Sequence, residues 1–594
     1  MPVAAAKARL WLSQLLLQHT QNINEATQHL QQAQLLLKQV PGSYDLKCQV
    51  LSELGRCQRY LARPKLEILA YERGLQICIS GQKSVERNHL HKWQAHFCQR
   101  LVDIHVAQGN LQDAHQVLNA ALENAVQFQD MRMQVLLQLA QLQLYMLSQN
   151  TAATGQVLSS CTALLVELER AASQPQEPLC SQLQLHFCVL RALCLMSEGR
   201  YNELLKTEKE RDAEIEKAKR KEKGIPEGEK AETEVDNTPI ISISELSRLL
   251  EQIGDREWEY TWLPTAAVHA LVFCLIATIY RPKTRFKQAL AYLSQAQQLI
   301  DEELQHQGIK GKESDLPLQA VCHHHSLLFI KFLIIEGAAM VHVTQVELEH
   351  AQRDLSVLLE LCTDHPALLG KPLLSSLYML IGNYALAAGD LSTAAERFVE
   401  AAQTGSSASQ ARLAAVSAAL ALLDTQQPDD ILKAADILRQ YEVFDDIDSK
   451  LPFAERGAGC FATGLVLMTQ GQETEGHLLL GKALRFAHGH LCNQQLVSQI
   501  TLAMAPKQMQ RGDTEGARNM LLSSLTLSST NHDVPTLVRG LHRMSHFHAK
   551  TGNTKEHHDC LERAEEKNTQ YLQVIEDAQN EPSHIQIMQW QGFS

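Results

Sequence analysis

This sequence has few aromatic residues and lacks the cysteine spacing typical of zinc sites. Aromatic residues make up only 5% of its 594 residues, whereas Leu, Ala and Gln dominate, a composition that favours packed helices over a large sheet. The fourteen cysteines never occur as CxxC, and most lie within apolar helical runs. Free, buried thiols in a reducing compartment are therefore expected.

Segments that direct secretion or membrane insertion are also lacking. The N-terminal Leu run is interrupted by Gln14 and Gln18, unlike the apolar core of a signal peptide. The most apolar segment, 266–280, is shorter than the ~20 residues that span a bilayer, and it contains His269. The sequence predicts a soluble intracellular protein with no membrane partner.

An excess of positive charge is absent as well. The chain has 54 Lys and Arg against 67 Asp and Glu, a formal net charge of −13. Such a balance gives no overall attraction to nucleic acid or anionic lipid. If the protein works at DNA, a partner is expected to supply most of the contact.

No motif with catalytic specificity is present. The chain has no phosphate-binding loop, HExxH, dinucleotide-binding GxGxxG or nucleophile elbow, so we expect no enzyme activity, cofactor or small-molecule substrate. His323, His324 and His325 point about 100° apart on a helix and cannot close on one ion. His542 and His546 share a helix face, but no Cys or carboxylate pattern completes a metal site, so we expect solvated helix residues there.

What the chain does have is one recurring helical pattern. A turn residue is followed five positions later by a small residue, nine by a large apolar one and twelve by another small one, all on one face of a helix. This is typical of the second helix of a tetratricopeptide-like hairpin, and its repetition predicts a solenoid that holds another chain. The repeat positions are Ala26, Leu30 and Ala33 after Gln21; Gly109, Ala114, Leu118 and Ala121; Ala289, Leu293 and Ala296; Gly389, Ala394, Phe398 and Ala401; Gly471, Gly476, Leu480 and Ala483; Gly512, Ala517, Leu521 and Ser524; and Gly552, His557, Leu561 and Ala564.

The spacing of the units sets their length. Ala394 to Gly476 covers two periods of 41 residues, and Gly476 to Ala517 covers one more. This period exceeds the 34 residues of the simple tetratricopeptide repeat, so longer helices or loops are expected. His557 replaces the usual Ala, which indicates a terminal, less buried hairpin.

Two further patterns complete the predicted architecture. Met133–Leu147 and Leu327–Ile335 are apolar around most of the helix, as inner helices of a stacked array are. We therefore predict an all-α, right-handed superhelix of about a dozen hairpins. Its predicted parts are an N-terminal array (1–205), a charged, partly disordered insertion (206–239), central hairpins (240–370), a C-terminal array (371–579) and an apolar tail that docks back on the array (580–594).

Two local features have competing interpretations. The basic run Lys217–Lys223 is either a nuclear import signal or a solvated helix face, and we favour the second. Trp262 and Pro264 begin a helical run, and we expect a core residue and a helix-starting Pro rather than a ligand platform.

Three stretches resemble one protein family. They are Leu15–Ala33 continuing into Val40–Leu54, Thr261–Pro264 followed by Ala266–Thr278, and His584–Gly592. In this order they resemble the small, tetratricopeptide-repeat subunit of the cohesin loading complex, in a form closest to the plant one. The matches lie at the start, middle and end of the sequence and so cover essentially the whole chain.

The resemblance implies a non-catalytic partner of the large HEAT-repeat loader subunit, the Nipped-B-like protein. The superhelix would wrap the extended N-terminal segment of that subunit, and the pair would place cohesin on chromatin for sister chromatid cohesion. Contact with cohesin is then indirect, and contact with chromatin is made mainly through the partner. The implied location is the nucleus, with the cytoplasm open as a second one.

The partner is expected on the concave lining of the array. We predict that this lining includes the helices around Trp93–Leu101, Gln134–Tyr145 and Phe187–Met196. Family members carry further helices before the region that matches Leu15, so the resemblance implies either a missing N-terminal piece or a shortened groove.

The main alternative is a repeat scaffold of another assembly, of the proteasome-lid, signalosome or translation-initiation type. Such subunits commonly append a winged-helix module with strands, whereas the end of this sequence predicts only hairpins and a short tail.

Overall fold

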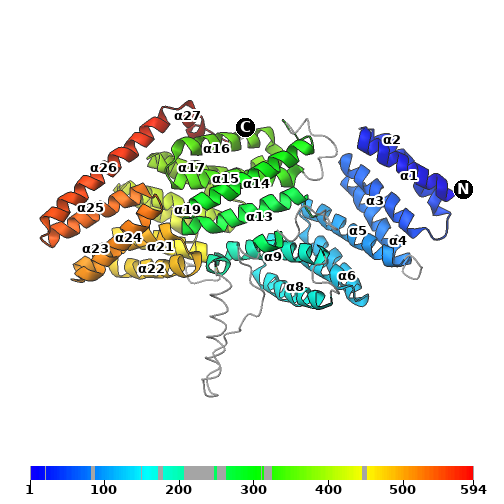
Figure 1. The fold of residues 1–594 in the computed structure, drawn as a ribbon, viewed down its shortest axis with the longest axis horizontal. Helices are drawn as coiled ribbons and strands as arrows, with labels where there is room; N and C mark the ends of the chain where they lie inside the picture. The colour runs from blue at the N-terminus through cyan, green and yellow to red at the C-terminus, as the bar shows by residue number, and fades with distance from the viewer. Residues whose placement is uncertain are drawn as a thin grey trace, which may run out of the picture.

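The computed structural model describes residues 2–20, 22–81, 87–148, 150–171, 178–205, 246–250, 262–309, 311–312, 324–443 and 451–592. Within these ranges every regular element is a helix, and consecutive helices pair into hairpins that stack along the chain (Figure 1). The predicted all-α solenoid of hairpins is therefore confirmed. The predicted insertion, 206–239, lies outside the described residues.

Each hairpin has a first and a second helix. The first helices are α1 (Pro2–His19), α3 (Tyr44–Tyr60), α5 (Arg87–Ala107), α7 (Met131–Leu147), α9 (Pro178–Glu198), α13 (Thr265–Tyr280), α15 (His324–Thr344), α17 (Lys371–Ala387), α19 (Ala408–Asp424), α21 (Phe453–Thr469), α23 (Gln494–Gln510) and α25 (Val534–Lys550).

The second helices follow after short turns. They are α2 (Ile23–Lys38), α4 (Pro64–Ser80), α6 (Leu111–Gln127), α8 (Thr151–Ala171), the short α10 (Tyr201–Leu204), α14 (Phe286–His306), α16 (Leu348–Asp364), α18 (Leu391–Thr404), α20 (Pro428–Gln440), α22 (Glu473–Phe486), α24 (Thr514–Thr530) and α26 (Thr554–Gln579). Single turns η1 (Arg281–Lys283), η4 (Pro366–Gly370) and η5 (Ala487–Leu491) and the final helix α27 (Pro582–Met588) complete the described elements.

The turn inside a hairpin follows directly from its sequence. Gly389 and Gly512 have φ of 80° and 82°, which glycine adopts without the steric penalty of a side chain. The residue after each glycine caps the second helix of its hairpin. Asp390 accepts a hydrogen bond from the Thr393 amide at 3.0 Å, and Asp513 accepts one from the Gly516 amide at the start of α24. Gly–Asp therefore ends one helix and begins the next.

The two helices of a hairpin cross so closely that a large residue on one requires a glycine on the other. The ring of Phe398 on α18 lies over Gly382 on α17, where an added Cβ would come within 2.6 Å of it. In the same way, the ring of Tyr71 covers Gly55. Phe398 and Tyr71 are at most 3% exposed. These small–large pairs seal the hairpins at native packing density.

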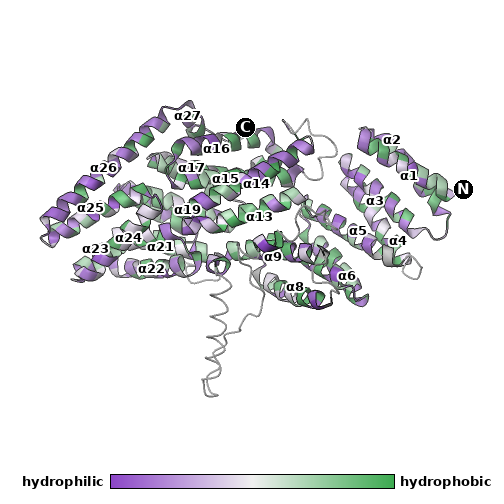
Figure 2. Ribbon diagram, viewed as in Figure 1, coloured by the Kyte–Doolittle hydropathy of each residue, from purple (hydrophilic) through white to green (hydrophobic). Residues whose placement is uncertain are grey.

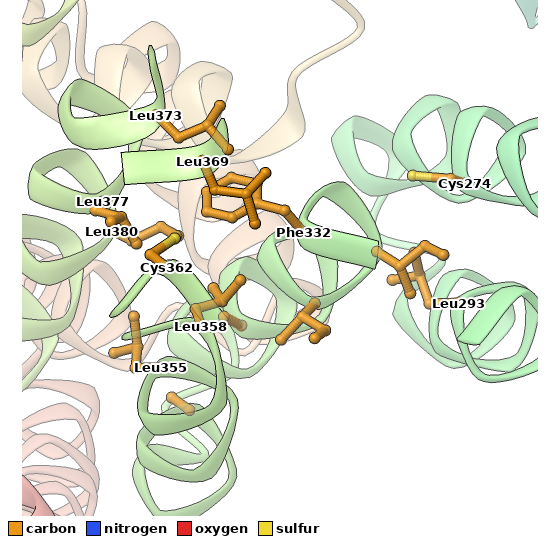
Figure 3. Close-up of a cluster of buried hydrophobic side chains, with 14 of the residues drawn as sticks. Cys274, Leu293, Phe332, Leu355, Leu358, Cys362, Leu369, Leu373, Leu377 and Leu380 are labelled. Atoms are coloured by element: carbon orange, nitrogen blue, oxygen red, sulfur yellow. The ribbon is translucent and has the colours of Figure 1, made fainter. Parts of the chain in front are cut away.

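The apolar core runs on from one hairpin into the next. Buried side chains of α13 to α17 form one cluster that includes Cys274, Leu293, Phe332 and Leu358, and Figure 3 shows these helices contributing to it together. Because each hairpin covers the apolar face of its neighbour, no hairpin in this region has a core of its own.

The C-terminal segment returns to the middle of the array, so that α27 lies beside α16 and α17 (Figure 1). Ile587 is fully buried, and the Trp590 ring lies 5.4 Å from the Tyr378 ring of α17. Arg397 of α18 donates a hydrogen bond to the Met588 carbonyl at 2.8 Å. The tail is therefore an integral part of the packed array.

A buried polar network joins the same segment to α16 and α17. The Gln352 amide donates to the Tyr384 hydroxyl at 2.7 Å and to the Ala578 carbonyl at 2.8 Å. The Gln352 side-chain oxygen accepts from the Ser583 hydroxyl at 2.7 Å, and Tyr384 also pairs with His584 at 2.8 Å. Satisfied buried polar groups of this kind fix one arrangement of the segments that they join.

A second long-range contact joins the centre of the chain to the C-terminal hairpins. The backbone at Gly199 approaches Ala454 and Leu491, and Thr284 donates a hydrogen bond to the Gln494 side chain at 3.2 Å. Elements around residue 200 and residue 284 thus touch α21, η5 and α23.

Two helices are longer and more apolar than expected from the sequence, which indicated that no segment was long enough to span a membrane. By length and composition alone, Thr265–Lys283 and His324–Thr344 are both long enough. Half of the first and 56% of the second are buried inside the array. Their apolar character is explained by packing between neighbouring hairpins.

The crossing of α21 and α22 generates a stability prediction. At Gly476, where the repeat pattern usually has Ala, an added Cβ would lie 2.8 Å from the Gly464 carbonyl oxygen. Gly476→Ala should destabilise the protein by about 1–3 kcal/mol, because backbone must move. Gly481→Ala on the same helix meets nothing within 4 Å and should be neutral or stabilise by up to about 1 kcal/mol. Thermal unfolding of the full chain compares the two, and equal melting temperatures would contradict the close crossing.

Candidate protein-binding groove

The first helices form one wall of the array. In nearly every pair of consecutive hairpins, the two first helices contact each other. The second helices of consecutive hairpins make no comparable contact among the described residues. An array curves toward the side on which its elements lie closer together. The first helices therefore form the inner, concave wall, and the second helices form the outer one.

The helices predicted as inner ones from their apolar sequence lie on this wall. Met133–Leu147 is in α7, and Leu327–Ile335 is in α15. About half of the first segment and most of the second are buried, because a first helix packs against its own second helix and against hairpins on two sides.

Polar side chains link neighbouring first helices at the N-terminal end of the wall. The Trp93 indole on α5 donates to Asp45 on α3 at 2.7 Å, and His96 lies 2.8 Å from the Ser52 hydroxyl. Burial lowers the pKa of His96 to about 4, with Arg100 adding to the effect, so the imidazole is neutral at neutral pH. All four paired side chains are only partly buried and so remain available to a ligand.

Similar links recur along the wall. Gln14 on α1 donates to Glu53 on α3 at 3.2 Å, and Arg412 on α19 pairs with Glu455 on α21 at 2.6 Å. Hydrogen-bonding groups at successive steps of a concave wall suit an extended polypeptide, whose backbone offers donors and acceptors at regular intervals. We call this set of inner-wall links the polar ladder.

The three segments predicted to line the groove differ in accessibility. Trp93–Leu101 and Gln134–Tyr145 both leave several side chains half-exposed. Phe187–Met196 leaves only Leu193 and Met196 partly exposed. His186, beside that segment, is 4% exposed and stacks on Trp262 at 3.9 Å, so Trp262 is packed as expected of a core residue. The accessible wall near the N-terminal end is therefore made by α3, α5 and α7.

The repeat positions themselves face the interior rather than a ligand. The second-helix positions named in the sequence are at most 5% exposed in every unit except the last, in which His557 and Leu561 are partly exposed and Ala564 is buried. His557 instead pairs with Ser545 on α25 at 2.7 Å. These residues build the hairpins, and the groove is lined by other ones.

The histidines and cysteines form no metal site among the described residues, where no group of three potential ligands comes together. His542 and His546 are exposed on α25, and His325 is exposed next to buried His324. Most cysteines of the described ranges are buried, and burial raises the pKa of thiols such as Cys161 to about 12. His323 lies outside the described residues.

The sequence did not predict the polar ladder. Its signal was the occurrence of a charged residue within a largely apolar first helix, such as Glu455 in α21. A buried charge of this kind must find a partner, which sequence spacing alone does not identify.

The chain matches known proteins over nearly its full length. The family model described as "Cohesin loading factor" matches residues 2–538. The sister chromatid cohesion protein SCC4 of Arabidopsis thaliana is 24% identical, over 99% of this chain and 86% of that protein. The MAU2 chromatid cohesion factor homolog of Drosophila melanogaster is 20% identical, over 92% of this chain and 79% of that protein.

Solved structures of low sequence identity are also similar. A crystal structure of Scc4 in complex with Scc2n has a TM-score of 0.49 at 11% identity and covers 96% of this chain and 90% of that chain. A Rap protein complexed with competence and sporulation factor has a TM-score of 0.43 at 11% identity, over 75% of this chain and 99% of that chain.

A half-buried acid on α15, Glu336, makes stability depend on pH. Burial raises the pKa of Glu336 to about 7, although nearby Arg281 lowers it. Between pH ~4.5 and ~7 the folded state holds a proton that the unfolded chain releases, so stability falls as pH rises through this window. Glu336→Gln should therefore stabilise the protein at pH ~8, by on the order of 1–2 kcal/mol, and have little effect at pH ~4.5.

Denaturant unfolding at both pH values measures this difference. Glu360→Gln, at an exposed position on neighbouring α16, is the matched control and should behave as the wild type at both. A pH-independent effect of Glu336→Gln would contradict the raised pKa.

Proposed function

Because the chain belongs to the cohesin loading factor family, we propose that it is the small scaffold subunit of a cohesin loader whose inner wall holds the extended N-terminal segment of the large HEAT-repeat subunit. Proteins of this family are non-catalytic scaffolds. The segment would lie along the first helices and form hydrogen bonds with the polar ladder.

One observation carries this proposal. The family match runs from residue 2 to residue 538 and so includes first helices from α1 into α25. The matched region thus contains almost the entire inner wall. A long continuous wall with polar groups at its steps supports binding of an extended segment over many hairpins, a geometry that compensates for the ordering cost of a flexible ligand.

The same proposal includes a place of action. Family membership implies a nuclear, chromatin-related role. We place the chain in the nucleus, where it would promote loading of cohesin for sister chromatid cohesion. Its net charge of −13 favours indirect contact with DNA, made by the large subunit.

Co-purification tests the partner. The full chain, co-expressed with the first few hundred residues of the large HEAT-repeat subunit, should elute with it as one complex on size exclusion. Recovery of the folded full chain without that segment would contradict the proposal.

A blocked-groove variant tests the surface. Leu136, Ala140, Gln143 and Leu147 lie on one stripe of α7 at helical spacing, all at least partly exposed. Ala140→Trp should weaken binding of the large subunit's segment by roughly tenfold or more, because the indole would occupy the groove. Ala120→Trp, exposed on the outer helix α6, is the matched control and should bind as the wild type. Equal binding by both variants would contradict the prediction that the segment lies on α7.

A further inference from the structure

Charge is divided between the two walls of the array. The twelve described first helices contain eighteen Lys and Arg against seven Asp and Glu, a net +11. The twelve described second helices contain fifteen against thirty, a net −15. Figure 2 shows the outer helix α26 as mostly hydrophilic, and it alone contributes seven acids. The chain as a whole has a negative net charge, but the first helices that form its inner wall have a positive one.

Every acid of the inner wall has a partner within the array. Each of the seven accepts a hydrogen bond or has a cation beside it: Asp45 with Trp93, Glu53 with Arg56, Asp103 with Arg100, Glu198 with Arg200, Glu336 near Arg281, Asp424 with Arg539 and Glu455 with Arg412. A ligand that enters the groove therefore meets mainly the remaining positive charge.

The positive charge is densest on α25. Arg539, His542, Arg543, His546 and Lys550 are all exposed and recur at three- and four-residue intervals, which places them on one face. The helix carries no Asp or Glu. Like charges at this spacing destabilise a helix by a few tenths of a kcal/mol per pair unless a counter-charge is present.

This face of α25 is the one that α23, α24 and α26, the helices packed on α25, leave exposed, and we therefore assign it to the inner wall. Arg539 on this face pairs at 2.7 Å with Asp424 on α19, three hairpins earlier in the chain. Arg543 donates to the Leu502 carbonyl on α23, and partial burial together with Arg539 lowers the pKa of its guanidinium. His548, on the other side of α25, instead faces Glu556 of α26.

Of the three Lys and Arg of the stripe, Arg539 has an ion pair, whereas Arg543 and Lys550 have none among the described residues. Among the acids around α25, Asp424 pairs with Arg539, Asp533 caps the N-terminus of the helix and accepts a hydrogen bond from Gln495 of α23, and Glu556 of α26 faces His548. The sequence drew attention to His542 and His546 as a conceivable metal pair, but two arginines and a lysine beside them disfavour a bound cation.

The space beside α25 bears on the choice between anionic ligands. Asp424 and Arg539 join α19 and α25 at 2.7 Å, so a ligand that lies against this face must fit around their ion pair. An extended polypeptide is narrow enough to lie along the wall.

We propose that the inner wall selects an acidic, extended polypeptide segment, and that the stripe of Arg539, His542, Arg543, His546 and Lys550 on α25 binds carboxylates of that segment. This deepens the proposed function and rests on it for the source of the segment, the large loader subunit. The outer acidic wall repels the same segment, so that it binds on the concave side only.

Charge reversal on the stripe tests the proposal. The variant is Arg539→Glu with Arg543→Glu, and the matched control is Lys555→Glu with Arg563→Glu on the exposed outer face of α26, which changes the net charge equally. The probe is a fluorescein-labelled peptide of about twenty glutamates, measured by anisotropy with the full chain at about 50 and 300 mM NaCl. Binding to wild type should weaken with salt. The α25 variant should bind roughly tenfold more weakly at low salt, and the control within about twofold of wild type.

A milder variant distinguishes loss of peptide binding from loss of folding. Arg539→Gln with Lys550→Gln leaves Arg543 and its contact to α23 intact, and it should weaken peptide binding by about threefold. Equal losses in the α25 and α26 variants would overturn the proposal, because only net charge would then matter. Displacement of the peptide by a short DNA duplex through the same residues would also overturn it.

Parallel binding of the large subunit's N-terminal segment separates this proposal from the proposed function. If that segment binds wild type and the α25 variant equally, the proposed function stands and the charge selection fails. If the glutamate peptide binds through α25 but the segment does not bind at all, the acidic-peptide site stands and the proposed partner is wrong.

Discussion

The close crossing of the two helices within each hairpin is the constraint on which the rest of the structure depends. At these crossings one helix offers a glycine or alanine and the other a large side chain, as Gly382 does for Phe398. The crossing sets how near the helices lie, and this in turn sets how much of each first helix is covered by its neighbours. A looser crossing would expose apolar surface along the whole inner wall, which the chain could not tolerate in water. The groove therefore exists because small residues recur where the helices meet.

How much of this was accessible from the sequence depends on the range of the interactions. The hairpins were predictable because their signals are local: Gly at the turn, an Asp cap, and Ala394, Phe398 and Ala401 on one helix face. The inner helices were predictable from their apolar sequence. The polar ladder and the contact between Gly199 and the later hairpins were not, because each joins residues that only the curvature of the array brings together. Curvature sums small rotations at every step, and no single residue encodes it.

The division of charge between the walls gives the array a second layer of organisation. Net charge describes solubility and long-range attraction, but a curved wall presents only one of its faces to a ligand. Here an acidic outer face keeps the protein soluble, and the basic inner face is free to recognise a partner. The same arrangement discourages self-association, since the outer walls of two copies repel each other. A chain that is acidic as a whole can thus carry a basic surface on one side.

Stacked repeats usually lose structure from their ends, because a terminal repeat has only one neighbour. In this chain the final residues instead return through Trp590 and Ile587 to helices about two hundred positions earlier. The last hairpins consequently have neighbours on two sides, and the C-terminal half has no fraying end. Its hairpins should open together in one cooperative transition, with a slow unfolding step that requires release of the tail, whereas the hairpins of α1 to α7 can open one at a time. The array would then have a flexible N-terminal end and a rigid C-terminal half. Such a difference suits the binding of a flexible segment step by step along its length.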